Sequence, residues 1–241
     1  KENLVPGYPS VREKEHLQET FGCHVGKEAA QQILQQENSL VGKESEISVM
    51  FVDVRNFTDH SSKHTPQEVV AALNVFFTKA VEIIEDHDGM VNKFLGDGFM
   101  ALFGIGDDQG NHAARAVDAG LAMLECLKGA CDELEQAGWC DFRIGIGLNT
   151  GPAIIGSIGS PKRQEYTAIG DTVNVAARVE ALTKSLGHYF IITEATRKHL
   201  PEEMPLVPLP PQKVKGKTYH LKVFAFAASV LDESEVGEPA S

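Results

Sequence analysis

Two aspartates have the residue type and the setting to do chemistry. Asp53 ends the apolar run Ile47–Asp53, and Asp97 lies between two glycines in the segment Gly96–Gly98. If the strands that carry them are neighbours, both carboxylates lie at one edge of a sheet. The chain has 22 basic and 34 acidic residues, a net charge of −12. Paired carboxylates in so acidic a protein suit two Mg²⁺ ions, which bind one or two carboxylates each and complete their shells with water and substrate phosphates.

Each aspartate also has a simpler explanation as a turn residue or a helix cap. This alternative is strong for Asp97, in its Gly-Asp-Gly turn, and weaker for Asp53, because the run before it is apolar. The segment Val54–Thr58 that follows could present main-chain N–H groups to phosphate. The sequence has no Walker A motif, and Gly145–Gly151 misses the dinucleotide fingerprint by one residue and falls in a strand, so a Rossmann site is rejected.

A second polar set lies on a predicted helix near the end of the chain. Asn174 and Arg178 are four residues apart and share one helix face, among small and apolar neighbours. Such a pair needs a polar partner, because unpaired burial is costly. The partner could be an acidic residue such as Glu180, or the phosphate or ribose of a ligand. Further on, Lys213–Lys217 alternates lysines, which suits either a polyphosphate or a solvated edge strand.

The elements that must position these residues alternate along the chain. The pattern predicts, in order, a strand at 47–53, a helix that starts at the capping box Thr65–Glu68, a hairpin of strands 90–95 and 99–103, a helix from Asn111 to Glu135, and a strand at 142–148. That order is the ferredoxin-like βαββαβ arrangement. Additional α/β elements are predicted at 153–157, 171–184, 189–192, after Thr193 and at 219–227. We expect an α+β fold with a mixed, mainly antiparallel sheet.

Composition divides the chain into three parts and excludes several functions. We expect a helical linker over 1–45, the folded domain over 46–227 and a disordered acidic tail over 228–241. No apolar stretch approaches the roughly 20 residues of a membrane span, and the net negative charge argues against nucleic-acid binding. Because the chain begins with Lys1 rather than Met, we expect a piece of a longer cytoplasmic protein that has an upstream regulatory domain; the whole protein could also carry a membrane anchor.

The blocks that carry these residues resemble the catalytic domain of the class III nucleotidyl cyclases, the adenylyl and guanylyl cyclases. The resemblance runs from about Ile47 to Phe226 and is carried by four ordered blocks: Phe51–Thr58, Lys93–Gly98, Gly170–Arg178 and Val214–Lys217. Residues 17–34 are similar to the helix that often precedes such domains and links them to regulatory modules.

The resemblance implies a role for each matched residue. Asp53 and Asp97, with the carbonyl of Val54, would bind two Mg²⁺ or Mn²⁺ ions, and the phosphates would lie near Phe57 and Thr58. The other roles are implied in the same way: purine recognition by Lys93 and Thr167, ribose positioning by Asn174, stabilisation of the α-phosphate by Arg178, and binding of the terminal phosphates by Lys215. In this family the sites lie at a dimer interface, with the Asp pair from one chain and the second set from the other, so a homodimer with two shared sites is implied.

The residues at the purine positions favour ATP over GTP. Many adenylyl cyclases carry Asp where this chain has Thr167, and Thr there is typical of the bacterial and soluble, bicarbonate-responsive subgroup. Guanylyl cyclases usually place Glu and Cys at the positions of Lys93 and Thr167. Lys93 can donate to adenine N1 and the Thr167 hydroxyl can accept from the 6-amino group, whereas guanine would leave polar groups unpaired. The sequence therefore predicts an adenylate cyclase; the alternatives are a guanylate cyclase or a non-catalytic nucleotide-binding module.

Overall fold

The computed structural model describes residues 42–106, 110–129, 131–136, 139, 142–160, 162–213 and 220–226. Most of the expected linker and all of the expected tail lie outside these residues. The described residues divide into two compact units: Ile155–Thr167 with Gly42 and Lys43, and Glu44–Ile154 with the described residues from Ala168 on. No helix among the described residues is both long and apolar enough to span a membrane.

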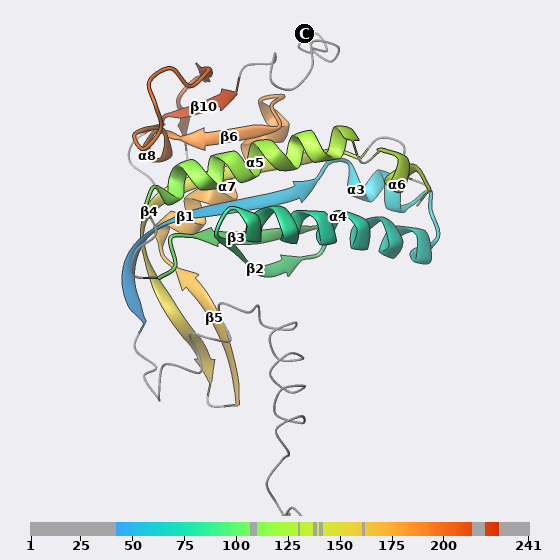
Figure 1. Ribbon diagram of the computed structural model, residues 1–241, viewed down its shortest axis with the longest axis horizontal. Coiled ribbons are helices and arrows are strands. Elements are labelled where there is room, and N and C mark those ends of the chain that lie inside the picture. Colours follow the sequence, from blue (N-terminus) through green and yellow to red (C-terminus); the bar gives the residue numbers. More distant parts are fainter. Residues whose placement is uncertain are drawn as a thin grey trace, which may run out of the picture. The chain divides into compact units, whose positions relative to one another are not determined.

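One eight-stranded sheet carries the fold (Figure 1), in the order β2-β3-β1-β4-β6-β10-β7 with β5 paired to β4. The strands are β1 (Lys43–Val54), β2 (Gly89–Leu95), β3 (Gly98–Phe103), β4 (Ile144–Ser160), β5 (Arg163–Ile169), β6 (Phe190–Thr193), β7 (Leu206–Pro208) and β10 (Val223–Phe226). Strands β1 and β3, β2 and β3, and β6 and β10 pair antiparallel, whereas β4 and β6 pair parallel. The predicted α+β fold with a mainly antiparallel sheet is confirmed, and β1 to β4 with their two helices form the βαββαβ core.

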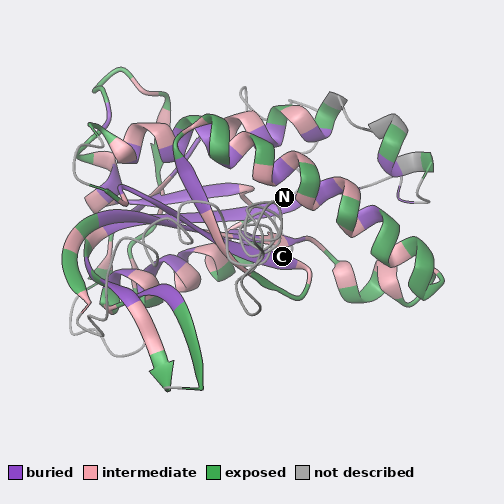
Figure 2. Cartoon of the chain, turned by 60° about the horizontal axis from the view of Figure 1, so that its bottom comes forward, coloured by how far each residue is buried: buried purple, intermediate pink, exposed green. Residues whose placement is uncertain are grey.

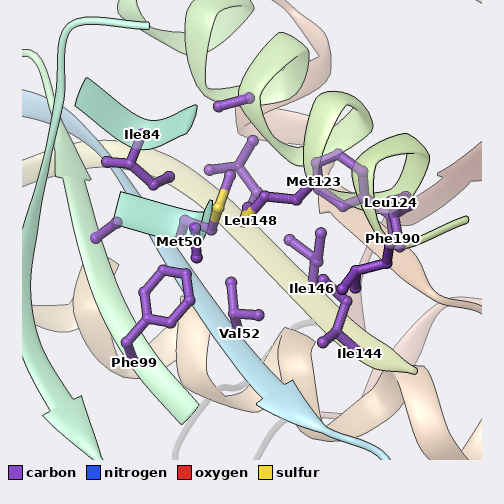
Figure 3. Close-up of a cluster of buried hydrophobic side chains, with 14 of the residues drawn as sticks. Met50, Val52, Ile84, Phe99, Met123, Leu124, Ile144, Ile146, Leu148 and Phe190 are labelled. Carbon is purple, nitrogen blue, oxygen red and sulfur yellow. The ribbon is translucent and has the colours of Figure 1, made fainter. Parts of the chain in front are cut away.

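Two long helices, α4 (Pro66–Asp86) and α5 (His112–Gly129), cover one face of the sheet (Figure 2). The predicted capping box starts α4: the hydroxyl of Thr65 accepts from the N–H of Glu68 at 3.3 Å, and the Glu68 carboxylate accepts from the N–H of Thr65 at 2.7 Å. Beneath these helices, buried side chains of β1, β4 and α5 meet in the main core (Figure 3), among them Met50, Leu148 and Met123.

On the other face of the sheet lies α7 (Asp171–Ser185). Neighbouring strand residues point to opposite faces, and β6 shows this directly: Ile192 belongs to the core under α4 and α5, whereas Ile191 packs with Val175 and Val179 of α7. The helix that carries Asn174 and Arg178 is therefore held by its own small apolar cluster.

Several predicted boundaries were wrong. The single helix expected from Asn111 to Glu135 is described as two helices, α5 and α6 (Cys131–Gln136). The strands expected at 142–148 and 153–157 are one strand, β4, in which Gly151 and Pro152 keep the strand conformation. The strand expected at 219–227 is two short ones, β9 (His220–Leu221), which pairs with β8 (Gln212–Lys213), and β10. Strands β5 and β7 were not predicted.

Buried side-chain hydrogen bonds link the N-terminal ends of α5 and α7 to the sheet. The hydroxyl of Ser48 lies 3.0 Å from Nδ1 of His112 and 2.7 Å from the hydroxyl of Thr150. Further along, the hydroxyl of Thr193 donates to Oδ1 of Asn149 at 2.7 Å, and the Asn149 amide donates to a carbonyl of α7 at 3.0 Å. We call this set the buried polar chain; its members are Ser48, His112, Asn149, Thr150, Thr172, Thr193 and Thr196.

Candidate active site

The structure brings Asp53 and Asp97 together at one edge of the sheet. Strands β1 and β3 pair Val52 with Phe99, so Asp53 lies opposite the turn that contains Asp97. The turn approaches β1 very closely: a Cβ on Gly98 would lie 2.2 Å from the carbonyl oxygen of Val52 and 2.8 Å from Oδ1 of Asp53. Only glycine permits this approach, so the Gly-Asp-Gly sequence is what places the two carboxylates side by side.

A cavity of about 390 Å³ opens beside the two carboxylates. Its wall includes five of the predicted site residues: Asp53, Val54, Phe57, Thr58 and Asp97. The other lining residues are Arg55, Asn56, Asp59, Glu180, Ala181 and Lys184. We call it the acidic cavity, because four of its eleven lining residues are Asp or Glu.

The acids of this cavity are poorly compensated within the chain. Burial raises the pKa of Asp53 above its ordinary value, and the nearby charge of Asp97 raises it further. Burial also raises the pKa of Asp97. Burial first, and then the charge of Asp53, raise the pKa of Glu180 to about 7. Raised carboxyl pKa values mean that negative charge is disfavoured here unless a cation joins it.

These residues fit divalent cations. Of the side chains that the structure describes, no group of three or more His, Cys, Asp or Glu is placed to hold a metal ion. A cation here would therefore take Asp53 and Asp97, with the carbonyl of Val54, and complete its shell with water and substrate phosphate. Mg²⁺ characteristically binds in this incomplete way. The cavity leaves room for a phosphate group beside the carboxylates.

The remaining predicted residues lie elsewhere. Lys93 is half-buried on β2, where a bulge between Val91 and Lys93 shifts the register. Asn174 is exposed on α7, and Arg178 is half-buried there with no ion pair or side-chain hydrogen bond to any described residue. Thr167, on β5, belongs to the other compact unit. Lys215 lies outside the described residues.

Six lining residues were not predicted as site residues: Arg55, Asn56, Asp59, Glu180, Ala181 and Lys184. The suggestion that Glu180 is the partner of Asn174 and Arg178 was wrong, because Glu180 lines the acidic cavity and its charge interacts with Asp53 and Arg55. Helix geometry could have shown this: two residues beyond Arg178 corresponds to about 200° of rotation, the opposite side of α7.

Comparisons with known proteins identify the family to which the chain is similar. Residues 41–227 match the family model of the adenylate and guanylate cyclase catalytic domain. "Adenylate cyclase 1" of Rhizobium meliloti is 31% identical over 225 residues, which are 92% of this chain and 34% of that protein. The chain spans about a third of the length of the curated relatives it matches.

Solved structures of both nucleotide specificities are similar to this chain. A bacterial light-regulated adenylyl cyclase is 26% identical with a TM-score of 0.76, covering 89% of this chain and 62% of the other. The guanylyl cyclase Cya2 is 30% identical with a TM-score of 0.68, covering 77% of this chain and 93% of the other.

Proposed function

This chain belongs to the adenylate and guanylate cyclase catalytic domain family, and we propose that it is an adenylate cyclase that converts ATP to 3′,5′-cyclic AMP and pyrophosphate in the cytoplasm. One observation carries the proposal: the acidic and the basic residues of the predicted site are not paired with each other within one described chain. Asp53 and Asp97 repel each other in an open cavity, and Arg178 has no acidic partner among the described residues of its own chain. A metal-bound polyphosphate held between two copies of the chain would satisfy both.

In the proposed reaction, the ribose 3′-hydroxyl gives its proton to solvent water and its oxygen attacks the α-phosphorus, while the bond from that phosphorus to the bridging oxygen breaks and pyrophosphate leaves. Mg²⁺ or Mn²⁺ ions at Asp53 and Asp97 would lower the pKa of the 3′-hydroxyl and neutralise phosphate charge. Arg178 would stabilise the charge that develops at the α-phosphate without carrying a proton. Asn174 would orient the ribose, and Lys215 would hold the terminal phosphates.

A homodimer follows from this division of roles. The Asp pair would come from one protomer, and Lys93, Thr167, Asn174 and Arg178 from its partner, so two copies would form two equivalent sites. Mixing two inactive variants, Asp53→Ala and Arg178→Ala, should therefore restore activity, because one of the two sites in a heterodimer is then intact. Purified heterodimers without activity would reject the shared site.

Guanylate cyclase is the second candidate, since the guanylyl cyclase Cya2 is a structural neighbour. We favour ATP because Lys93 and Thr167 complement adenine, and because the Rhizobium relative is named an adenylate cyclase. The test is to incubate the chain with ATP or GTP and Mn²⁺ or Mg²⁺ and to measure each cyclic nucleotide. Cyclic GMP as the main product would overturn the ATP assignment. With ATP confirmed, Lys93→Glu combined with Thr167→Cys should move the preference toward GTP.

A further inference from the structure

Helix α7 has two functional sides. Asn174 and Arg178 share one side, four residues apart. Glu180 and Lys184, also four residues apart, are on another and line the acidic cavity. One rigid element therefore carries both a wall of its own protomer's cavity and the residues that, under the proposed function, complete the partner's site.

The side of α7 that lines the cavity packs directly against strand β4. A Cβ on Gly147 of β4 would lie 2.1 Å from the main-chain nitrogen of Glu180 and 2.4 Å from its Cα. A Cβ on Gly145 would lie 2.7 Å from the hydroxyl of Thr183 and 2.8 Å from Nη2 of Arg55. The two glycines thus let helix backbone and an arginine side chain press directly on β4, so a displacement on this side moves the whole helix.

Arg55 connects the metal-binding strand to the end of this helix. It stands two residues after Asp53, and its main-chain N–H donates to the carbonyl of Arg143 at 2.7 Å. Its Nη2 donates to the carbonyl of His188 at 3.0 Å, just beyond the point where α7 ends at Ser185. The N–H of His188 donates in turn to the carbonyl of Thr183 on α7 at 3.0 Å, so the half-buried Arg55 is joined to the helix through His188.

Charge links the same groups. Glu180 is repelled by Asp53 and attracted by Arg55, and Arg55 is attracted by both acids. When cations neutralise Asp53 and Asp97, the repulsion of Glu180 disappears while its attraction to Arg55 is retained. Cation binding in the cavity therefore changes the force on α7 at Glu180.

We propose that Arg55 and Glu180 are positioning residues that couple the acidic cavity of a protomer, through α7, to the orientation of the Arg178 on the same helix. The inference rests on the proposed function, in which that Arg178 serves the other active site of the dimer. Cation binding in one site then prepares the second. Placement is sensitive, since a shift of about 1 Å in a catalytic group can cost roughly 100-fold in rate.

Hydrogen exchange measures the coupling without any turnover. Mn²⁺ should slow amide exchange across residues 171–185 in the native chain, and should slow it much less in Glu180→Gln. Glu203→Gln, the same chemical change at an exposed position outside the cavity, is the matched control and should behave as the native chain. Equal Mn²⁺ protection of α7 in Glu180→Gln and the control would overturn the coupling.

The kinetics of heterodimers with a single intact active site then show in which protomer Glu180 acts. A protomer with Arg178→Ala is paired with one that keeps Arg178, so the only intact site uses the Asp pair of the first and the arginine of the second. Glu180→Gln in the first protomer should raise the Mn²⁺ concentration for half-maximal rate about 10-fold, as for groups that support metal ligands. Glu180→Gln in the second protomer should leave the Mn²⁺ concentration for half-maximal rate unchanged and should lower kcat about 10-fold.

The outcomes separate this inference from the proposed function. If complementation between Asp53→Ala and Arg178→Ala fails, the shared site is wrong, whereas Mn²⁺-dependent exchange in α7 still tests the coupling. If complementation succeeds and Glu180→Gln in the arginine-lending protomer leaves kcat within twofold of the control, the coupling is wrong. Arg55→Lys, which keeps the charge and loses the planar fork, is the second variant should Glu180→Gln fail to fold, and should give the same loss of Mn²⁺ protection.

Discussion

The acidic cavity and the buried polar chain use polar residues in opposite ways. In the buried polar chain every hydroxyl and amide has a partner, from His112 through Ser48 to Thr172, and every member except His112 is buried. In the acidic cavity, burial raises the pKa values of Asp53, Asp97 and Glu180, and repulsion from neighbouring acids raises those of Asp53 and Glu180 further. One region is satisfied by the chain alone, and the other is not.

The difference teaches how to separate structural from functional polarity. Buried polar groups that are fully hydrogen-bonded stabilise one arrangement of the core. Charged groups without an oppositely charged partner lower the stability of the fold. A protein retains such groups where a ligand supplies the opposite charge. Substitutions in the two regions should therefore move stability and activity in different directions.

The largest expected effect is that of Asp97→Asn. Loss of one carboxylate from the proposed metal pair should abolish measurable cyclase activity. Without metal, the same change should raise the free energy of unfolding by about 0.5–2 kcal/mol, because repulsion with Asp53 is removed. Urea unfolding in EDTA and a cyclic AMP assay with Mn²⁺ measure the two effects. A variant that is less stable without metal would show that Asp97 has a structural role instead.

Arg178→Ala comes next. Loss of one oriented charge at the transition state should lower kcat roughly 10²–10³-fold, with a much smaller change in KM. Because Arg178 has no ion pair or side-chain hydrogen bond among the described residues, the free energy of unfolding should change by less than about 0.5 kcal/mol. A large loss of stability with near-native turnover of the folded fraction would contradict both statements.

Thr193→Val tests the other region. The valine cannot donate to Asn149 or cap α8 (Glu194–Arg197), which begins after it, so the unfolding free energy should fall by about 1–3 kcal/mol. The folded fraction should keep kcat within about twofold, since the change lies outside the acidic cavity. Thr78→Val, at an exposed position on α4, is the matched control: it also loses one hydroxyl hydrogen bond, to the carbonyl of Asn74, but should change the unfolding free energy by less than about 0.5 kcal/mol and leave kcat unchanged. A tenfold loss of kcat in Thr193→Val would mean that the buried polar chain also serves catalysis.

The sequence predicted what depends on local signals. An apolar run that ends in Asp53, and a Gly-Asp-Gly turn, were enough to place two carboxylates at one sheet edge. The capping box at Thr65 fixed the start of α4 in the same way. The roles of Thr167 and Lys215 stay predictions, because one belongs to the other compact unit and the other lies outside the described residues.

What the sequence did not predict depends on contacts between distant segments. Glu180 reaches the acidic cavity because Gly145 and Gly147, more than thirty residues earlier, allow α7 to lie directly on β4. The buried polar chain links residues up to 102 positions apart, so no local pattern could reveal it. No local pattern distinguishes His112 either, although its ring bonds to the buried hydroxyl of Ser48.

The smallest expected effect is the pH dependence that His112 contributes. Burial lowers the pKa of His112, and the charges of nearby His199 and Arg115 lower it further, whereas the charge of Glu46 raises it. The unfolded chain then binds a proton more readily than the folded one, so this contribution to stability is complete above about pH 6.5 and is lost as the pH falls below it. The acidic cavity acts with the opposite sign: its raised carboxyl pKa values favour the folded state as the pH falls from about 7.

A comparison of variants isolates the contribution of His112 to the pH dependence of stability. Between pH 7.5 and pH 5.5, His112→Gln should lose less unfolding free energy than the native chain, by about 0.5 kcal/mol, since solvent screens a half-buried ring. His220→Gln, at an exposed position, should follow the native curve. Urea unfolding in EDTA at both pH values measures the difference. If His112→Gln lost more stability at low pH than the native chain, the ring would be held in its protonated form in the fold, and the buried polar chain would contain a charge that its hydrogen bonds do not neutralise.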